Sequence, residues 1–123
     1  MKKIIITGGS GFIGSNLVNF LLDKKFFVIN IDKLSYSSNK LNLKKKKNYI
    51  FYKLDINNKL KLRKIINKHK PVAIFNLAAE THVDRSIDDP KIFIKNNING
   101  TFSLLEAFNK YSKQNKSLKL IHV

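Results

Sequence analysis

Short apolar runs alternate along this chain with longer segments whose apolar residues recur at helical spacing. The runs have the character of strands buried on both faces, which is typical of a parallel sheet covered by helices. This alternation predicts an α/β, Rossmann-type doubly wound parallel sheet, with its first five strands in the order 3-2-1-4-5 and helices on both faces. The predicted strands are residues 2–7, 26–32, 49–56, 71–79 and 118–123, and the predicted helices are residues 12–25, 58–70 and 89–113. We expect the last strand, in SLKLIHV, to be buried rather than a frayed tail.

The segment TGGSGFIG follows the first predicted strand and opens the first predicted helix. It contains the spacing Gly-x-Gly-x-x-Gly, which indicates a dinucleotide-binding turn when a strand precedes it and a helix follows. Gly8 and Gly11 are expected to let the backbone turn tightly and approach a pyrophosphate, and Gly14 to let the helix pack closely. The helix N-terminus would supply free amides for the phosphates. A tight turn without a ligand is the alternative.

Polar and small residues at the carboxyl ends of the later strands support this interpretation. Asp32 can accept both ribose hydroxyls of adenosine, which favours NAD over NADP because a carboxylate repels a 2′-phosphate; Lys33 softens that preference. A solvated aspartate at a strand end is the alternative. Asp55 can reach the adenine amino group beside an apolar wall at Ile56, and the small residues of NLAAE (76–80) would let the backbone lie against the dinucleotide.

The chain is strongly basic, with 24 Lys and Arg against 8 Asp and Glu and a net charge of +16. Such a charge suggests nucleic-acid binding. However, nearly all the basic residues are lysines, with Arg63 and Arg85 as the arginines, and the lysines are scattered apart from the run Lys44–Lys47. Base-reading proteins depend on arginine forks. We interpret the charge as a solvated surface with the Lys, Asn and Ile content of an A/T-rich coding sequence. No nucleic-acid partner is expected.

The absence of cysteine excludes a disulfide framework, a thiolate zinc site and a cysteine nucleophile, and no metal site is expected. The apolar run after the first lysines is too short for a signal peptide, and no stretch approaches the roughly 20 apolar residues that span a bilayer. These features predict a soluble cytoplasmic protein with no membrane partner.

The motifs also carry a family resemblance. TGGSGFIG, NIDKLSY, LDI, NLAAETHVDRSIDDP and FIKNNINGTFSLLEAF resemble the extended short-chain dehydrogenase/reductase superfamily. Within it they are similar to the dTDP-glucose 4,6-dehydratase family, NAD-dependent nucleotide-sugar lyases of deoxysugar biosynthesis, which have DKLTY and AAESHVDRSI where this chain has DKLSY and AAETHVDRSI. The resemblance implies that residues 1–123 are an incomplete NAD-binding Rossmann domain whose substrate-binding half is absent.

The resemblance further implies which residues contact ligands. Thr81 and Arg85 would contact the sugar nucleotide; a salt bridge from Arg85 to Asp84 or Asp88 is the alternative. Asn96 stands where the family commonly has threonine, which leaves its cofactor contact open. The residues expected to bind NAD are Gly8, Gly11, Phe12, Ile13, Gly14, Asp32, Lys33, Leu34, Ser35, Asp55, Ile56, Leu77, Ala78, Ala79, Glu80 and Asn96.

The chemistry of that family oxidises C4 of dTDP-glucose with a tyrosine base and NAD, eliminates water across C5 and C6 with an Asp/Glu pair, and returns the hydride to C6. The resemblance places those catalytic residues, in STDEVYG and a Tyr-x-x-x-Lys pair, beyond Val123. We therefore expect no catalytic residue and no turnover in this chain alone. Tyr36…Lys40 and Tyr49…Lys53 match the pair by chance.

The expected partners are the nucleotide-sugar substrate and, for the full-length form, a second copy in a homodimer. Two alternatives stay open: another dehydratase or epimerase that uses a UDP- or GDP-sugar, and a stand-alone NAD-binding module. We also expect the last strand to present a bare apolar edge that is prone to pair with other chains.

Overall fold

The computed structural model describes residues 1–33, 47–77, 91, 100–113 and 117–123. They contain a five-stranded sheet in the order β3-β2-β1-β4-β5, in which every pairing is parallel. The predicted strand order is confirmed. The strands are β1 (Lys3–Thr7), β2 (Phe27–Asp32), β3 (Tyr49–Lys53), β4 (Ala73–Asn76) and β5 (Lys119–His122), and the helices are α1 (Phe12–Asp23), α3 (Lys59–His69) and α6 (Gly100–Ser112).

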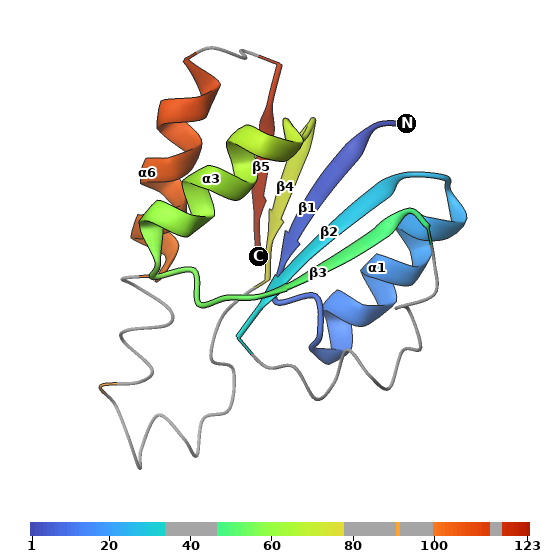
Figure 1. Cartoon of the computed structure of the whole chain (residues 1–123). Helices are drawn as coiled ribbons and strands as arrows, with labels where there is room; N and C mark the ends of the chain where they lie inside the picture. Colours follow the sequence, from blue (N-terminus) through green and yellow to red (C-terminus); the bar gives the residue numbers. More distant parts are fainter. Residues whose placement is uncertain (34–46, 78–90, 92–99, 114–116) are drawn as a thin grey trace.

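The helices cover both faces of the sheet, as predicted (Figure 1). α1 lies on one face, where Val18 and Leu22 pack against alternate residues of β1 such as Ile4 and Ile6. α3 and α6 lie on the other face. There the intervening Ile5 packs in a second apolar cluster with Leu62 of α3 and Leu104 of α6, the α3–α6 cluster. Successive side chains of a strand point to opposite faces, so the central strands are buried on both sides and read as continuous apolar runs.

Local signals set the limits of α3, the helix after β3. The Asn58 side chain accepts a hydrogen bond from the Lys61 amide at 3.3 Å and caps the first turn. Lys70 adopts a left-handed conformation with φ 49°, and its amide donates to the Ile66 carbonyl at 2.9 Å. An ion pair between Lys59 and Glu106 joins this helix to α6.

The strands β3 and β4 are shorter than predicted. β3 ends at Lys53 because the chain turns into α3, with the Asn58 amide donating to the Asp55 carbonyl at 2.9 Å. β4 ends at Asn76, although the Leu77 amide still donates to the Thr7 carbonyl at 2.9 Å. The predicted strand residues 78–79 and the start of the predicted helix at 89–113 lie largely outside the described residues.

The expectation that the last strand is buried is wrong, whereas the expectation that it forms an edge of the sheet agrees with the described strands. β5 forms with its predicted apolar sequence, but among the described strands it pairs with β4 alone and so lies at the edge of the sheet. Leu120 packs against the α3–α6 cluster, whereas Ile121 is 36% exposed and Val123 is 71% exposed. The physical reason is that α1, on the opposite face, packs against β1 and β2 rather than β5. Among the described helices, none is long and apolar enough to cross a membrane.

Candidate functional site

The turn between β1 and α1 lies at the carboxyl end of the sheet. Gly8 has φ 75°, a left-handed conformation that favours glycine, and its amide donates to the Ile31 carbonyl of β2 at 2.8 Å. The Gly11 amide returns to the Gly8 carbonyl at 3.2 Å and closes the turn. The tight turn predicted at Gly8 is therefore confirmed.

Two glycines of the turn differ in whether the structure requires glycine at their position. A Cβ on Gly14 would lie 2.2 Å from the Gly8 carbonyl oxygen and 2.7 Å from the Gly9 Cα, so α1 can approach the turn only with glycine there. A Cβ on Gly11 would meet the Gly8 oxygen at an ordinary 3.5 Å, and Gly11 has φ −77°. The prediction that the turn itself needs glycine at Gly11 is wrong, because any residue adopts that conformation. The predicted close approach of a ligand to the backbone at Gly11 stays a prediction.

The first turn of α1 is arranged to accept an anion. Its first internal hydrogen bond runs from the Ser15 amide to the Gly11 carbonyl at 2.8 Å. The amides of Phe12, Ile13 and Gly14 precede it and have no acceptor within the helix. No acidic residue lies in this turn, and the Phe12 and Ile13 side chains are 86% and 65% exposed. The positive end of the helix dipole is thus open to a negatively charged group.

Asp32, at the end of β2, lies directly against the turn. Its Oδ2 accepts a hydrogen bond from the Ser10 amide at 3.1 Å, and the residue is only 9% exposed. This contact excludes the alternative that Asp32 is merely a solvated aspartate at a strand end. It brings a carboxylate next to the amides that open α1. Lys33 beside it is exposed.

Two polar residues that sequence reasoning missed, Asn30 and Tyr49, lie beneath the turn and connect to Ser10 within it. The Asn30 Nδ2 donates to the Ser10 Oγ at 3.3 Å and to the Tyr49 hydroxyl at 3.0 Å. Burial raises the pKa of Tyr49, and the Asp32 charge adds to this rise while the hydrogen bond from Asn30 opposes it. The sequence signal was present: an asparagine interrupts the apolar run FFVINID.

Three further predicted cofactor contacts, at Asp55, Ile56 and Leu77, are less exposed than Phe12 and Ile13. The Asp55 Oδ1 accepts hydrogen bonds from the Asn57 amide and side chain, both at 2.9 Å, and so stabilises the turn into α3. Ile56 is only 5% exposed and packs in the α3–α6 cluster. Leu77 packs against the opposite cluster, under α1. The roles of these three residues toward a cofactor stay predictions.

A polar row crosses the carboxyl end of the sheet from β1 to β5. The Thr7 hydroxyl donates to the Asn76 Oδ1 at 2.6 Å, and the Asn76 Nδ2 lies 2.9 Å from the His122 Nδ1. These three residues are in register on adjacent strands. The row lies at the reversal of strand order between β1 and β4, where open α/β sheets bind ligands.

The remaining predicted contacts fall outside the described residues. They are Leu34, Ser35, Ala78, Ala79, Glu80, Thr81, Arg85 and Asn96.

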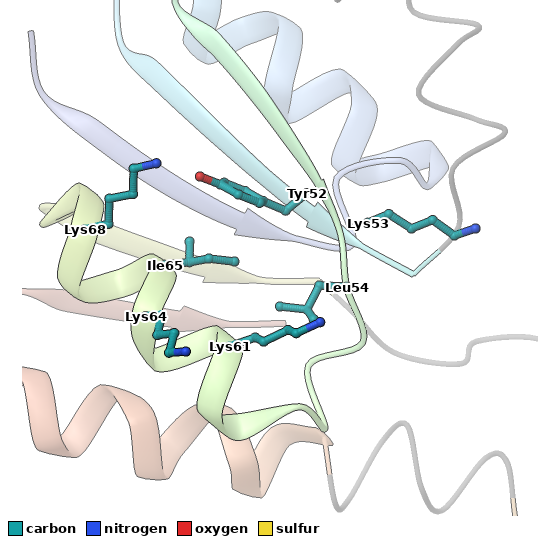
Figure 2. A pocket seen from close by; sticks show the side chains of 7 residues that line it. All are labelled: Tyr52, Lys53, Leu54, Lys61, Lys64, Ile65 and Lys68. Carbon is teal, nitrogen blue, oxygen red and sulfur yellow. The ribbon is translucent and has the colours of Figure 1, made fainter.

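A shallow groove of about 370 Å³ lies elsewhere, between β3 and α3 (Figure 2). Apolar side chains such as Leu54 and Ile65 form its floor, and lysines of α3 such as Lys61 and Lys64 line its rim. None of the described residues predicted to hold a cofactor lines it. The groove and the glycine turn are therefore separate features.

A parallel sheet with a glycine turn after β1, an open helix N-terminus and a carboxylate at the end of β2 defines a Rossmann-type dinucleotide-binding domain. The family model described as GDP-mannose 4,6 dehydratase matches residues 5–123. The chain belongs to this family.

Among curated relatives, the chain is 45% identical over 115 residues to a dTDP-glucose 4,6-dehydratase of Haemophilus influenzae, and the match covers 90% of this chain and 34% of the relative. A dTDP-glucose 4,6-dehydratase from Bacillus anthracis, solved in complex with NAD, superposes with a TM-score of 0.79 at 35% identity, over 99% of this chain and 37% of that one. A UDP-glucose 4-epimerase from Thermotoga maritima, solved with UDP-glucose, gives a TM-score of 0.80 at 36% identity, over 89% and 34% of the two chains. The chain thus spans about a third of the length of the relatives it matches.

Proposed function

We propose that this chain is the NAD-binding N-terminal part of a dTDP-glucose 4,6-dehydratase, which converts dTDP-glucose to dTDP-4-keto-6-deoxyglucose. One observation carries the proposal: Asp32 is joined to the Ser10 amide across a glycine turn that opens α1. That contact brings a ribose acceptor and free helix amides together. The similarity to dTDP-glucose 4,6-dehydratases, one of them solved with NAD, supports the choice of enzyme and cofactor.

The described residues fit a dinucleotide. The turn backbone takes the space that a Cβ on Gly14 would fill, so α1 begins directly against the turn, and the residues Phe12 and Ile13 that open it are exposed. No acidic residue in that first turn of α1 opposes a pyrophosphate. An exposed glycine at Gly11, with no close contact around its missing Cβ, allows a ligand to approach the backbone.

The roles of the chain's own residues follow from this fit. The Phe12 and Ile13 amides would bind the pyrophosphate, and the Asp32 carboxylate would accept the hydroxyls of the adenosine ribose. Asp55 would lie near the adenine. When bound, NAD supplies the hydride acceptor for the oxidation of the sugar. The proposed cofactor set is completed by residues outside the described ranges: Leu34, Ser35, Ala78, Ala79, Glu80 and Asn96. Thr81 and Arg85 would contact the sugar nucleotide.

The rest of the enzyme's function belongs to the same proposal. The whole protein would be a lyase that works as a homodimer in the cytoplasm, with no nucleic-acid or membrane partner. The 123-residue chain would bind NAD without turning over dTDP-glucose, because the family's catalytic residues correspond to positions beyond Val123.

A UDP-sugar epimerase is the second candidate, and the similarity to the Thermotoga maritima epimerase favours it to a comparable degree at the level of fold. Reading the coding sequence downstream of the Val123 codon separates the two. A continuation with an STDEVYG-like segment and a Tyr-x-x-x-Lys pair supports the dehydratase.

The activity test uses the longest polypeptide that this coding sequence encodes. Incubated with NAD and dTDP-glucose, it should form the 4-keto-6-deoxy sugar, whereas UDP-glucose should be left unchanged. Epimerisation of UDP-glucose without loss of water would overturn the dehydratase assignment.

A further inference from the structure

The Ser10 residue of the glycine turn is held to β2 by two hydrogen bonds. Its amide donates to the Asp32 Oδ2 at 3.1 Å, and its hydroxyl oxygen accepts from the Asn30 Nδ2 at 3.3 Å. Asn30 and Asp32 are two residues apart on one strand, so their side chains share a face of the sheet. Ser10 is 5% exposed, which places both bonds in the interior.

Asn30 is not explained by packing. It is fully buried, and the residues of the same layer, such as Ile6 and Val28, are apolar. Its Oδ1 has no hydrogen-bond partner among the residues that the structure describes, an arrangement that an apolar residue of similar size would avoid. The same oxygen would lie 2.3 Å from a Cβ on Gly9. The turn thus accommodates this asparagine at some cost to stability, which points to a role for the amide.

Tyr49 anchors the amide from the other side. Its hydroxyl accepts from the Asn30 Nδ2 at 3.0 Å, and Tyr49 itself is 8% exposed in the cluster under α1. One Asn30 nitrogen therefore connects β3 to the glycine turn through Ser10. Burial raises the pKa of Tyr49, the hydrogen bond from Asn30 opposes this rise, and the charge of Asp32 adds to it.

We infer that Asn30, anchored by Tyr49, is a positioning residue that acts through Ser10 to hold the Asp32 carboxylate against the glycine turn, and so strengthens NAD binding and the preference for NAD over NADP. This inference rests on the proposed NAD-binding function. The carboxylate must face the ribose to accept its hydroxyls and to repel a 2′-phosphate. Without Asn30, Ser10 loses one of its two bonds to β2, and Asp32 loses the fixed orientation of its partner.

The test measures the dissociation constants for NAD and NADP by titration calorimetry, with the unfolding midpoint of each variant in urea. We expect Asn30→Leu and Ser10→Ala each to weaken NAD binding by about three- to tenfold. Each should also bring the dissociation constants for NAD and NADP closer together. Tyr49→Phe should act in the same direction but less, because the bond to Ser10 remains. The double variant that combines Asn30→Leu with Ser10→Ala should bind NAD no more weakly than the weaker-binding of these two single variants, because both changes remove the same interaction.

Asn48→Ala is the matched control. The Asn48 side chain donates to the Phe26 carbonyl at 3.0 Å, at the opposite end of β2 from the turn. It should lower the unfolding midpoint without changing either dissociation constant. Ser10→Ala keeps the test valid if Asn30→Leu does not fold.

The outcomes separate the two proposals. NAD binding by the wild-type chain with unchanged affinity and cofactor ratio in Ser10→Ala and Tyr49→Phe would overturn the positioning role alone. Additive losses in the double variant would also overturn it. A folded wild-type chain that does not bind NAD would overturn the proposed function and this inference with it.

Discussion

The Thr7 hydroxyl donates a hydrogen bond to the Asn76 Oδ1 at 2.6 Å, between two strands that are adjacent in space and 69 residues apart in sequence. Both side chains are nearly inaccessible to solvent, with exposures of 0% and 2%. The pair ties β1 to β4, where the strand order reverses and where open α/β sheets bind their ligands. A buried polar pair at this point fixes the floor of the proposed cofactor site.

The first prediction concerns this pair. Thr7→Val keeps the shape of the side chain but leaves the Asn76 Oδ1 without its donor. The free energy of unfolding in urea should fall by about 1–3 kcal/mol, the cost of an unsatisfied buried acceptor. Ser112→Ala is the control, because that exposed hydroxyl donates only to the Asn109 carbonyl of its own helix; it should change stability by less than about 0.5 kcal/mol. Equal effects of the two changes would contradict the structural role of the pair.

The second prediction separates two glycines of the turn. Gly14→Ala places a Cβ 2.2 Å from the Gly8 backbone oxygen, so the helix must shift and the free energy of unfolding should fall by about 1–3 kcal/mol. Gly11→Ala has room for its Cβ and a compatible backbone, so its stability should stay near that of the wild type. Urea denaturation followed by circular dichroism measures both.

NAD binding by the Gly11→Ala variant gives the complementary result. If a pyrophosphate lies against this backbone, the folded variant should bind NAD at least several-fold more weakly than the wild type. Unchanged affinity would show that the ligand does not approach the turn at Gly11.

The third prediction is a loss of stability in mild acid through His69. Burial lowers the pKa of this imidazole below its ordinary value of 6.5, and the charges of Lys3 and Lys68 lower it further. As the pH falls, the unfolded chain therefore binds this proton before the folded chain does. The contribution of neutral His69 to the free energy of unfolding is fully present above about pH 6.5 and is lost as the pH falls from there toward the folded-state pKa. The neutral ring also forms a 2.8 Å hydrogen bond with the Tyr52 hydroxyl.

The measurement is the free energy of unfolding as a function of pH for the wild type and His69→Gln. The variant should show a smaller decrease between neutral and mildly acidic pH, whatever its absolute stability. An unchanged slope in His69→Gln would assign the dependence to other groups.

The fourth prediction concerns the charge of Asp32. Asp32→Asn keeps an acceptor for the Ser10 amide but removes the carboxylate that would bind the ribose and repel a 2′-phosphate. The affinity for NAD should fall by about tenfold, and the preference over NADP should be largely lost. Asp23→Asn, at the exposed end of α1, should leave both affinities unchanged. Calorimetric titration with each cofactor checks this.

The sequence was sufficient to predict the sheet order and the helices on both faces, because apolar periodicity and the glycine turn are local signals. It also indicated Gly8, Gly14 and Asp32. The support beneath the turn could not be predicted in the same way. Asn30 and Tyr49 meet only through the register of β2 and β3, and a polar residue in an apolar run shows that a partner is needed without showing which one.

Two other features depended on neighbours rather than on residue type. Gly11 was expected to be needed for the turn. Its backbone has a conformation that any residue adopts, and its amide closes the turn by donating to the Gly8 carbonyl. The last strand has an apolar sequence, yet Ile121 is exposed because sequence periodicity does not report which elements cover a strand.

Calorimetric titration of the folded 123-residue chain with NAD and then with NADP tests the central claim most directly. The chain contains no tryptophan, so a heat signal is preferable to intrinsic indole fluorescence. We predict saturable binding of NAD at a single site and weaker binding of NADP. Absence of NAD binding by chains that are folded by circular dichroism, or tighter binding of NADP, would contradict the claim that the Asp32 carboxylate and the turn after β1 form an NAD site.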